Sequence, residues 1–144
     1  MALDYTSVMV AQPFEETDHT ADRALTVRGK DLDDLLQNAA LGMVRLSGAV
    51  AGPGPIQLRE IHLRAVDEGS LLISWLEELL YSLEILGLTW VDTAIHTHDG
   101  QELQAVVQQA PLASLTQSIK AVTYHALRIR RSDEGLETTV VFDV

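Results

Sequence analysis

Apolar residues recur at three- and four-residue spacing in two stretches of the chain, and this period predicts two amphipathic α-helices. The first helix is expected over about residues 31–46 and the second over about residues 70–86. Asp31 is placed to cap the first helix, and either Asp67 or Ser70 is placed to cap the second. The apolar stripes consist of Leu32, Leu35, Leu36, Ala39, Ala40, Met43, Val44, Leu72, Trp75, Leu76, Leu79, Leu80, Leu83 and Leu86.

The remaining segments alternate polar and apolar residues or are rich in β-branched residues, which favours β-strands. Residues 99–100, an Asp-Gly pair, and residues 133–135 separate such segments and predict two hairpins. The alternation breaks near Glu60, which predicts a β-bulge, and the Gly-Pro-Gly-Pro run at residues 52–55 predicts a tight loop. The predicted strands cover residues 23–28, 56–66, 89–97, 102–107, 122–129 and 137–144.

The order of these elements predicts an α+β fold, a single-domain sandwich in which an antiparallel or mixed β-sheet packs with two α-helices. A chain of 144 residues has the length of one domain, and it contains no internal repeat. We assign residues 13–144 to this domain and residues 1–12 to an N-terminal extension.

Composition narrows the functions that we expect. The absence of cysteine excludes disulfides, thiolate metal sites and cysteine nucleophiles. The net charge of −11 repels nucleic-acid phosphates, so we expect contact with RNA only through a partner. An acidic surface suits a hard cation or a basic partner protein, although it also serves solubility alone. No segment approaches the ~20 apolar residues that cross a membrane, and residues 1–12 do not resemble a signal peptide, so we expect a cytoplasmic protein without membrane contact.

Two short segments carry carboxylates that need a partner. Asp22 opens a predicted strand directly after a polar run that contains Asp18 and His19. Asp143 lies in a strand that continues to Val144, so its side chain is close to a free α-carboxylate. If Asp22 lies nearby, three carboxylates converge and favour a hard cation such as calcium, magnesium or manganese. The alternatives are a loop cap in the first segment and a solvated strand end in the second.

Other polar residues give weaker indications. Lys120 could steady an anion or balance the charge of such a carboxylate cluster, or it could be an ordinary solvated lysine. His96 and His98 share one strand face and could bind a transition metal, but they lead into a predicted turn, where polar residues are common. The phosphate-loop, nucleophile-elbow and His-Glu-x-x-His motifs are absent, so the motifs indicate no catalytic centre.

Five short motifs, taken in order, resemble the archease family over nearly the whole chain after the first dozen residues. Each motif is short, but their order in a chain of this size is specific. The family often has glutamate where this chain has Asp18. The motifs are His-Thr-Ala-Asp at residues 19–22, the helical run at residues 32–40, and residues 75–81, 120–125 and 141–144.

This resemblance implies a partner of an RtcB-type RNA ligase, which seals RNA ends in tRNA splicing and RNA repair. Archeases promote the attachment of GMP to the ligase and so permit multiple turnover, and no catalysis of their own is expected. The resemblance implies a divalent cation, calcium, manganese or magnesium, on Asp22 and Asp143, with the Val144 carboxylate as a further ligand. It also implies a functional lysine at Lys120, and His19 belongs to the same motif as Asp22.

Two other functions stay open from the residues alone. A metal-dependent phosphoester hydrolase would use Asp22 and Asp143 with His19 or His125, and it would turn over substrate without a partner. A chaperone-like interaction module would bind unfolded clients through an apolar patch and would be indifferent to chelators.

Overall fold

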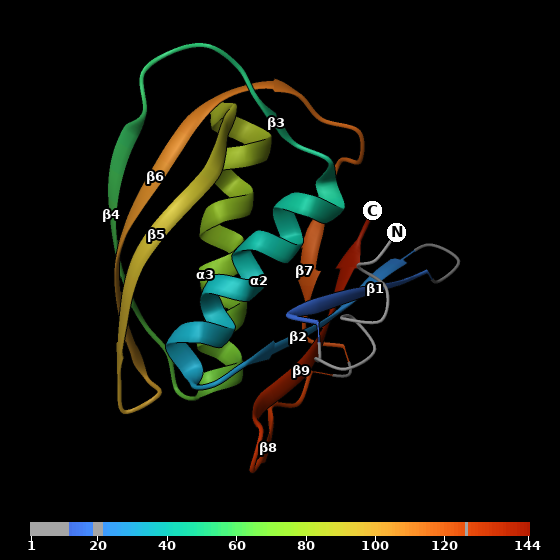
Figure 1. Cartoon of the computed structure of the whole chain (residues 1–144), viewed down its shortest axis with the longest axis vertical. Coiled ribbons are helices and arrows are strands. Elements are labelled where there is room, and N and C mark those ends of the chain that lie inside the picture. Colours follow the sequence, from blue (N-terminus) through green and yellow to red (C-terminus); the bar gives the residue numbers. More distant parts are fainter. Residues whose placement is uncertain (1–11, 19–21, 126) are drawn as a thin grey trace, which may run out of the picture.

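The computed structural model describes residues 12–18, 22–125 and 127–144 of the chain. These residues form two β-sheets with two α-helices between them (Figure 1). The strands are β1 (Phe14–Asp18), β2 (Asp22–Gly29), β3 (Val50–Ala51), β4 (Gln57–Arg64), β5 (Leu88–His98), β6 (Glu102–Ser114), β7 (Ala121–Thr123), β8 (Arg130–Ser132) and β9 (Gly135–Asp143), and the helical segments are α2 (Leu32–Ser47), α3 (Glu68–Tyr81) and the π-helical turn η1 (Ser82–Leu86).

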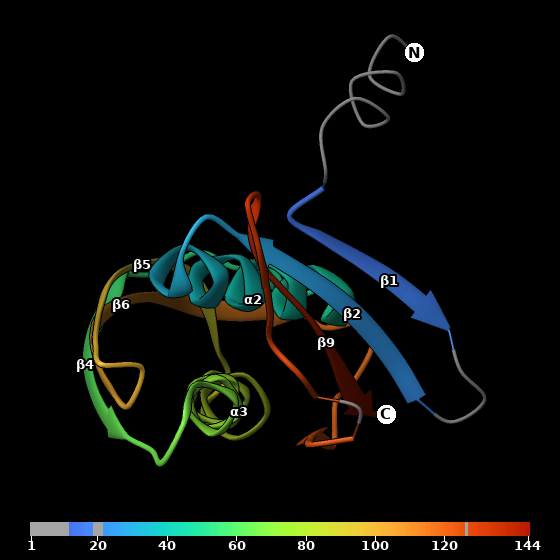
Figure 2. The same ribbon diagram turned by 90° about the horizontal axis from the view of Figure 1, so that it is seen from below.

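Both sheets are antiparallel in every pairing between described strands. The first sheet has the strand order β1-β2-β9-β7, with β8 also paired to β9. In the second sheet, β6 pairs with β4, β5 and β3. Helix α2 contacts β2 and β5, and α3 contacts β7 and β4, so each helix packs between the sheets (Figure 2). The predicted α+β sandwich with two α-helices is confirmed, and its sheets are antiparallel rather than mixed.

Helix α2 begins and ends at residues that satisfy its terminal backbone groups. Asp31 accepts a hydrogen bond from the amide of Asp34 at 2.9 Å, as an N-cap does. Asp33 and Asp34 lie in the first turn, where the helix dipole favours negative charge. Gly48 ends the helix at φ 66°, a left-handed conformation that favours glycine. The predicted first helix is therefore confirmed.

Helix α3 is capped by Asp67, whose carboxylate accepts a hydrogen bond from the amide of Ser70 at 2.8 Å. This hydrogen bond holds the pKa of the Asp67 carboxyl below its usual value. The regular helix ends at Tyr81 and continues as η1, which the helical period does not predict. In the core, the indole of Trp75 donates to the carbonyl of Leu36 at 2.9 Å and ties the two helices together. None of the described helices is long and apolar enough to cross a membrane.

The predicted hairpin at residues 99–100 joins β5 to β6. Asp99 and Gly100 have φ values of 55° and 66°, as the two central residues of a type I′ turn require. The amide of Gln101 donates to the carbonyl of His98 at 3.1 Å and closes this turn.

The bulge predicted near Glu60 is wrong, because β4 pairs with β6 in continuous register. The register of this sheet shifts instead in β5, between Trp90 and Asp92, and in β3, between Val50 and Ala51. Leu58 is 70% exposed whereas Ile61 is buried. The alternation of β4 is broken because an apolar side chain lies on the solvent face of the sheet.

The prediction of one strand over residues 122–129 is also wrong. Strand β7 ends at Thr123, and β8 begins only at Arg130. The hydroxyl of Thr123 accepts a hydrogen bond from the amide of His125 at 3.2 Å, and such local turns compete with strand pairing. The hairpin predicted at residues 133–135 is confirmed, because β8 and β9 pair around it.

Candidate functional site

Two aspartates that are far apart in sequence lie opposite each other at one end of the first sheet. The antiparallel register of β2 and β9 aligns Asp22 with Asp143. Val140 and Phe142 of β9 are fully buried, so the alternation of the strand directs Asp143 to the outer face. Residues directly opposite each other have Cβ atoms about 4.5–5.5 Å apart. The expectation that these acids meet in space is confirmed, and we call them the aspartate pair.

Lys120 is joined to the aspartate pair by a main-chain hydrogen bond. Strand β7 pairs with β9 so that Ala121 is the register partner of Asp143. The amide of Lys120 donates to the carbonyl of Asp143 at 2.7 Å. The side chain of Lys120 is exposed, and among the described residues its ammonium forms no ion pair. Three predicted site residues, Asp22, Asp143 and Lys120, thus lie at one end of one sheet.

The other predicted site residues are described less fully. Asp18 ends β1, where its main chain is the register partner of Arg23, the residue after Asp22. His19 lies outside the described residues, so its role and that of the Asp18 side chain stay predictions. Val144 follows Asp143 and packs its side chain against the core, which fixes the strand end that carries the aspartate.

The aspartate pair has the donor chemistry that a hard divalent cation requires. Asp22 is half-buried and Asp143 is exposed, and in the described pairings of β9 with β2 and β7 the partners of Asp143 are Asp22 and Ala121, neither of which is basic. Like charges directly opposite each other repel, and a cation would remove this repulsion while using carboxylate oxygens as ligands. Within the described side chains, no group of three or more His, Asp or Glu residues could hold a metal ion. Further ligands would therefore come from elsewhere, and Asp18 and His19 are adjacent in sequence to this end of the sheet.

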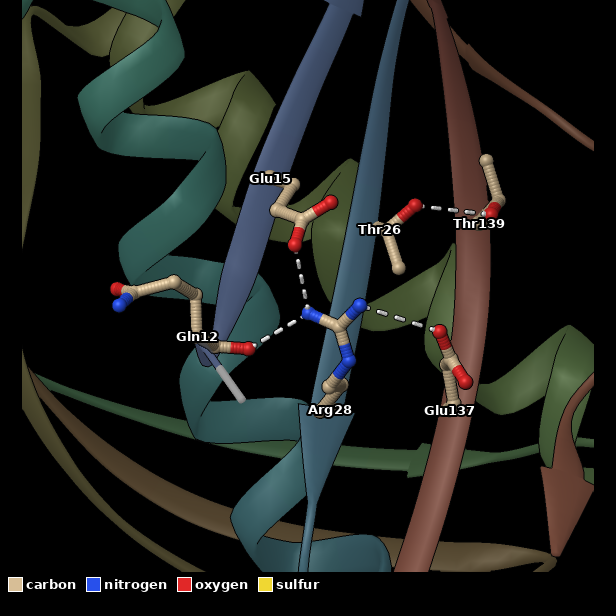
Figure 3. A network of polar contacts seen from close by, with 6 residues as sticks. All are labelled: Gln12, Glu15, Thr26, Arg28, Glu137 and Thr139. Atoms are coloured by element: carbon tan, nitrogen blue, oxygen red, sulfur yellow. Dashed lines mark hydrogen bonds and ion pairs between the residues drawn. The ribbon is translucent and has the colours of Figure 1, made fainter. Parts of the chain in front are cut away.

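On the same outer face of the first sheet, other acidic side chains are neutralised by an arginine of the chain itself. Arg28 of β2 is the register partner of Glu137 of β9, and their side chains lie 3.4 Å apart (Figure 3). Arg28 also lies 3.4 Å from Glu15 and donates to the carbonyl of Gln12 at 2.8 Å. Gln12 is the only described residue of the predicted extension over residues 1–12. An acid opposite an arginine at one end of the strands thus contrasts with the aspartate pair at the other.

A broad hollow on the described surface lies away from these residues. It has a volume of about 590 Å³ and lies over the outer face of the second sheet. His96 lines it. Among the described residues, His96 and His98 belong to no group of three or more His, Asp or Glu that could hold a metal ion, so the transition-metal pair stays a prediction. The residues that line it are Glu60, Ile61, His62, Ala94, Ile95, His96, Gln104, Ala105 and Val106.

A smaller groove lies beside Lys120. It has a volume of about 290 Å³ and runs between the end of α3 with η1 and the segment that enters β7. Tyr81 and Ile85 on its helical side are 51% and 67% exposed, so the rim of the groove carries accessible apolar surface. The groove is lined by Glu77, Leu80, Tyr81, Glu84, Ile85, Ile119, Lys120, Ala121 and Val122.

Comparison with known proteins gives a consistent family relationship. The model of the Archease protein family matches residues 14–144 of the chain. A protein archease of Methanosarcina barkeri is 35% identical over 147 residues, which cover 91% of this chain and 95% of that protein. A protein archease of Saccharolobus islandicus is 33% identical over 150 residues and covers 91% of this chain and 98% of its own length.

Solved structures agree on the fold. The crystal structure of an archease from Thermotoga maritima, described as a possible chaperone, superposes with a TM-score of 0.68 at 24% identity and covers 90% of this chain and 96% of its own. The solution structure of a Methanobacterium thermoautotrophicum protein superposes with a TM-score of 0.64 at 28% identity, covering 92% of this chain and 99% of its own.

Proposed function

The chain belongs to the archease family, and from this premise we propose that it is a metal-binding accessory protein that activates an RtcB-type RNA ligase. In this role it promotes guanylylation of the ligase and multiple turnover in tRNA splicing or RNA repair. It has no catalysis of its own, works in the cytoplasm, and contacts RNA only through the ligase. The net charge of −11 supports the last point, because a strongly acidic chain is repelled by nucleic-acid phosphates.

The observation that carries this proposal is the aspartate pair. Two carboxylates that lie directly opposite each other repel and destabilise the folded sheet, and a bound cation would offset this repulsion. Asp22 and Asp143 would hold a divalent cation, calcium, manganese or magnesium, and a carboxylate at Val144 would add a further oxygen ligand. Asp18 and His19 would complete or orient this set. Bound there, the cation supplies positive charge that stabilises a phosphoryl group.

Lys120 has a separate task in this proposal. Its exposed ammonium would contact the phosphates of the nucleotide or an acid of the ligase, since no described carboxylate neutralises it. The hydrogen bond from its amide to Asp143 keeps the lysine and the aspartate pair in a fixed relation. The chain would therefore present an acidic and a basic group together to the nucleotide pocket of the ligase, which favours productive phosphoryl-transfer geometry.

The test is a guanylylation assay with the purified ligase, GTP and sub-stoichiometric amounts of this protein. Wild-type protein is expected to raise the rate of GMP attachment and to permit repeated ligation, and excess chelator followed by dialysis should abolish the effect until metal is restored. Asp22→Asn is expected to lose most of the stimulation, whereas Glu137→Gln, which changes an acid on the same sheet face, should retain it. No stimulation by the wild-type protein at any metal concentration would refute the proposal.

A chaperone-like module is the alternative with a specific observation behind it. The Thermotoga maritima relative is described as a possible chaperone, and this chain exposes Tyr81, Ile85 and Leu86 around η1. This function predicts suppression of aggregation of unfolded clients that is unaffected by chelator and by Asp22→Asn. A hydrolase, by contrast, would release phosphate from small phosphoesters without the ligase. Either result, together with an unstimulated ligase, would replace the activator proposal.

A further inference from the structure

The turn η1 carries an acid that holds the segment leading to Lys120. Glu84 is half-buried, and its carboxylate accepts two hydrogen bonds from a segment remote in sequence. The hydroxyl of Ser118 donates to Oε1 at 2.9 Å, and the amide of Ile119 donates to Oε2 at 3.1 Å. Hydrogen bonds to an ionised acceptor are stronger than those between neutral groups. The carboxylate therefore fixes this segment at both a side chain and a backbone group.

The next amide along the chain is fixed from the other side. Lys120 donates its amide to the carbonyl of Asp143, and the side chain of Ile119 is only 1% exposed. The main chain before β7 is thus held between Glu84 of η1 and the end of β9. Because two successive amides are bonded in opposite directions, the backbone at Lys120 has little freedom to rotate.

The π-helical geometry is part of this arrangement. A π-turn bonds each amide to a carbonyl five residues back, which widens the helix and changes the direction of its side chains relative to α-helical continuation. Such turns occur frequently at functional sites. Here the widened turn follows Tyr81 and ends at Gly87, whose φ of 68° stops the helix. Glu84 lies within it and faces the segment before β7.

We propose that Glu84 is a positioning residue that sets the place of Lys120 relative to the aspartate pair. Glu84 acts through the backbone of Ile119 and does not itself touch the metal or the nucleotide. This inference rests on the proposed function, because the value of positioning Lys120 depends on its role in ligase activation. The hydrogen bonds themselves are independent of that role, so the two can be tested apart.

The groove beside Lys120 offers a matched control. Glu77 of α3 lines the same groove and carries the same charge, but it is exposed and forms no hydrogen bond or ion pair within the described residues. Glu77→Ala therefore removes an equal charge at a similar place without releasing the segment. Glu84→Gln keeps an oxygen that can accept from the Ile119 amide and serves as the conservative rescue.

The first measurement is amide hydrogen exchange by NMR on the full chain without ligase. Glu84→Ala is expected to speed amide exchange at Ile119 and Lys120 roughly 10-fold. Exchange requires local opening of the segment, and opening costs less free energy when the hydrogen bond to the Glu84 carboxylate is absent. Glu84→Gln should restore most of the protection, and Glu77→Ala should leave exchange unchanged. Unchanged exchange in Glu84→Ala would overturn the positioning role whatever the ligase does. Should Glu84→Ala fail to fold, Ser118→Ala removes one of the two hydrogen bonds and is expected to give a smaller increase.

The second measurement is maximal stimulation of ligase guanylylation. Glu84→Ala is expected to lower it roughly 3- to 10-fold at unchanged calcium affinity, with rescue by Glu84→Gln. In a Lys120→Met background the same substitution should change nothing further, because its effect passes through the lysine. Full stimulation by Glu84→Ala, or additive losses in the double variant, would overturn the inference. An unstimulated ligase with wild-type protein would instead refute the proposed function, and the exchange result would still decide the hydrogen bonds.

Discussion

Neutralising Asp143 is expected to change the stability of the fold in opposite directions with and without a divalent cation. Without metal, Asp143→Asn removes a negative charge that lies directly opposite Asp22. Cross-strand pairs of charges contribute roughly 0.2–1 kcal/mol, and like charges are unfavourable. In buffer with a chelator, the free energy of unfolding of Asp143→Asn is therefore expected to be higher than that of the wild type by up to about 1 kcal/mol.

With metal the sign reverses, because a ligand that binds only the folded state stabilises it. At a calcium concentration of about 100 times the Kd, the wild type gains about 2.7 kcal/mol. Asp143→Asn lacks one of the two carboxylates and gains much less at the same concentration. The metal-free advantage of the variant is subtracted from the stabilisation that calcium gives the wild type. In calcium, the free energy of unfolding of the wild type is then expected to exceed that of the variant by roughly 2 kcal/mol.

The assay is urea unfolding followed by circular dichroism, in chelator and in calcium. Glu137→Gln is the matched control, since Glu137 lies on the same strand and face but 3.4 Å from Arg28. Losing that partly exposed ion pair should cost at most about 1 kcal/mol, equally in both buffers. If Asp143→Asn differs from the wild type with the same sign and size in both buffers, the aspartate pair does not bind the cation and the reasoning is refuted.

Three further predictions follow from other parts of the structure. Lys120→Met should leave the melting temperature and calcium affinity unchanged but lower ligase stimulation at least about 10-fold, as removal of a charged contact does; parallel calorimetry and guanylylation assays check this. Because the folded-state pKa of Asp67 is lowered by the Ser70 amide, its stabilisation is present above the ordinary carboxyl pKa and is lost as the pH falls through the lowered value. The melting-temperature advantage of wild type over Asp67→Asn should accordingly shrink on acidification. Gly135→Ala should destabilise the fold by about 2–4 kcal/mol in urea unfolding, because φ is 120° and the added Cβ would lie 2.3 Å from the carbonyl of Gly29.

Elements with a strong local signal could be predicted from the sequence. The helical period, the Asp31 cap and the Asp99-Gly100 turn each depend on neighbouring residues, and all three occur as expected. The terminal strand was also predictable, because Val140 and Phe142 alternate with outward-facing positions and are buried.

Features that depend on tertiary contacts could not be predicted in this way. Glu84 lies in an apolar helical stretch, and only the folded chain brings Ser118 and Ile119 to its carboxylate. The early end of β7 depends on hydrogen bonds of Thr123, whose hydroxyl also donates to the carbonyl of Val141 at 3.0 Å. The sequence predicts the meeting of Asp22 and Asp143 only conditionally, because register between strands remote in sequence is set by packing of their buried faces.

Anomalous X-ray diffraction from crystals of the protein grown with manganese tests the central claim most directly. The account predicts one strong anomalous peak at the outer face of the first sheet, within about 2.6 Å of carboxylate oxygens of both Asp22 and Asp143. Crystals of Asp22→Asn grown under the same conditions should lack it. A wild-type map without a peak between these two aspartates, at a manganese concentration that supports ligase activation, would contradict the account.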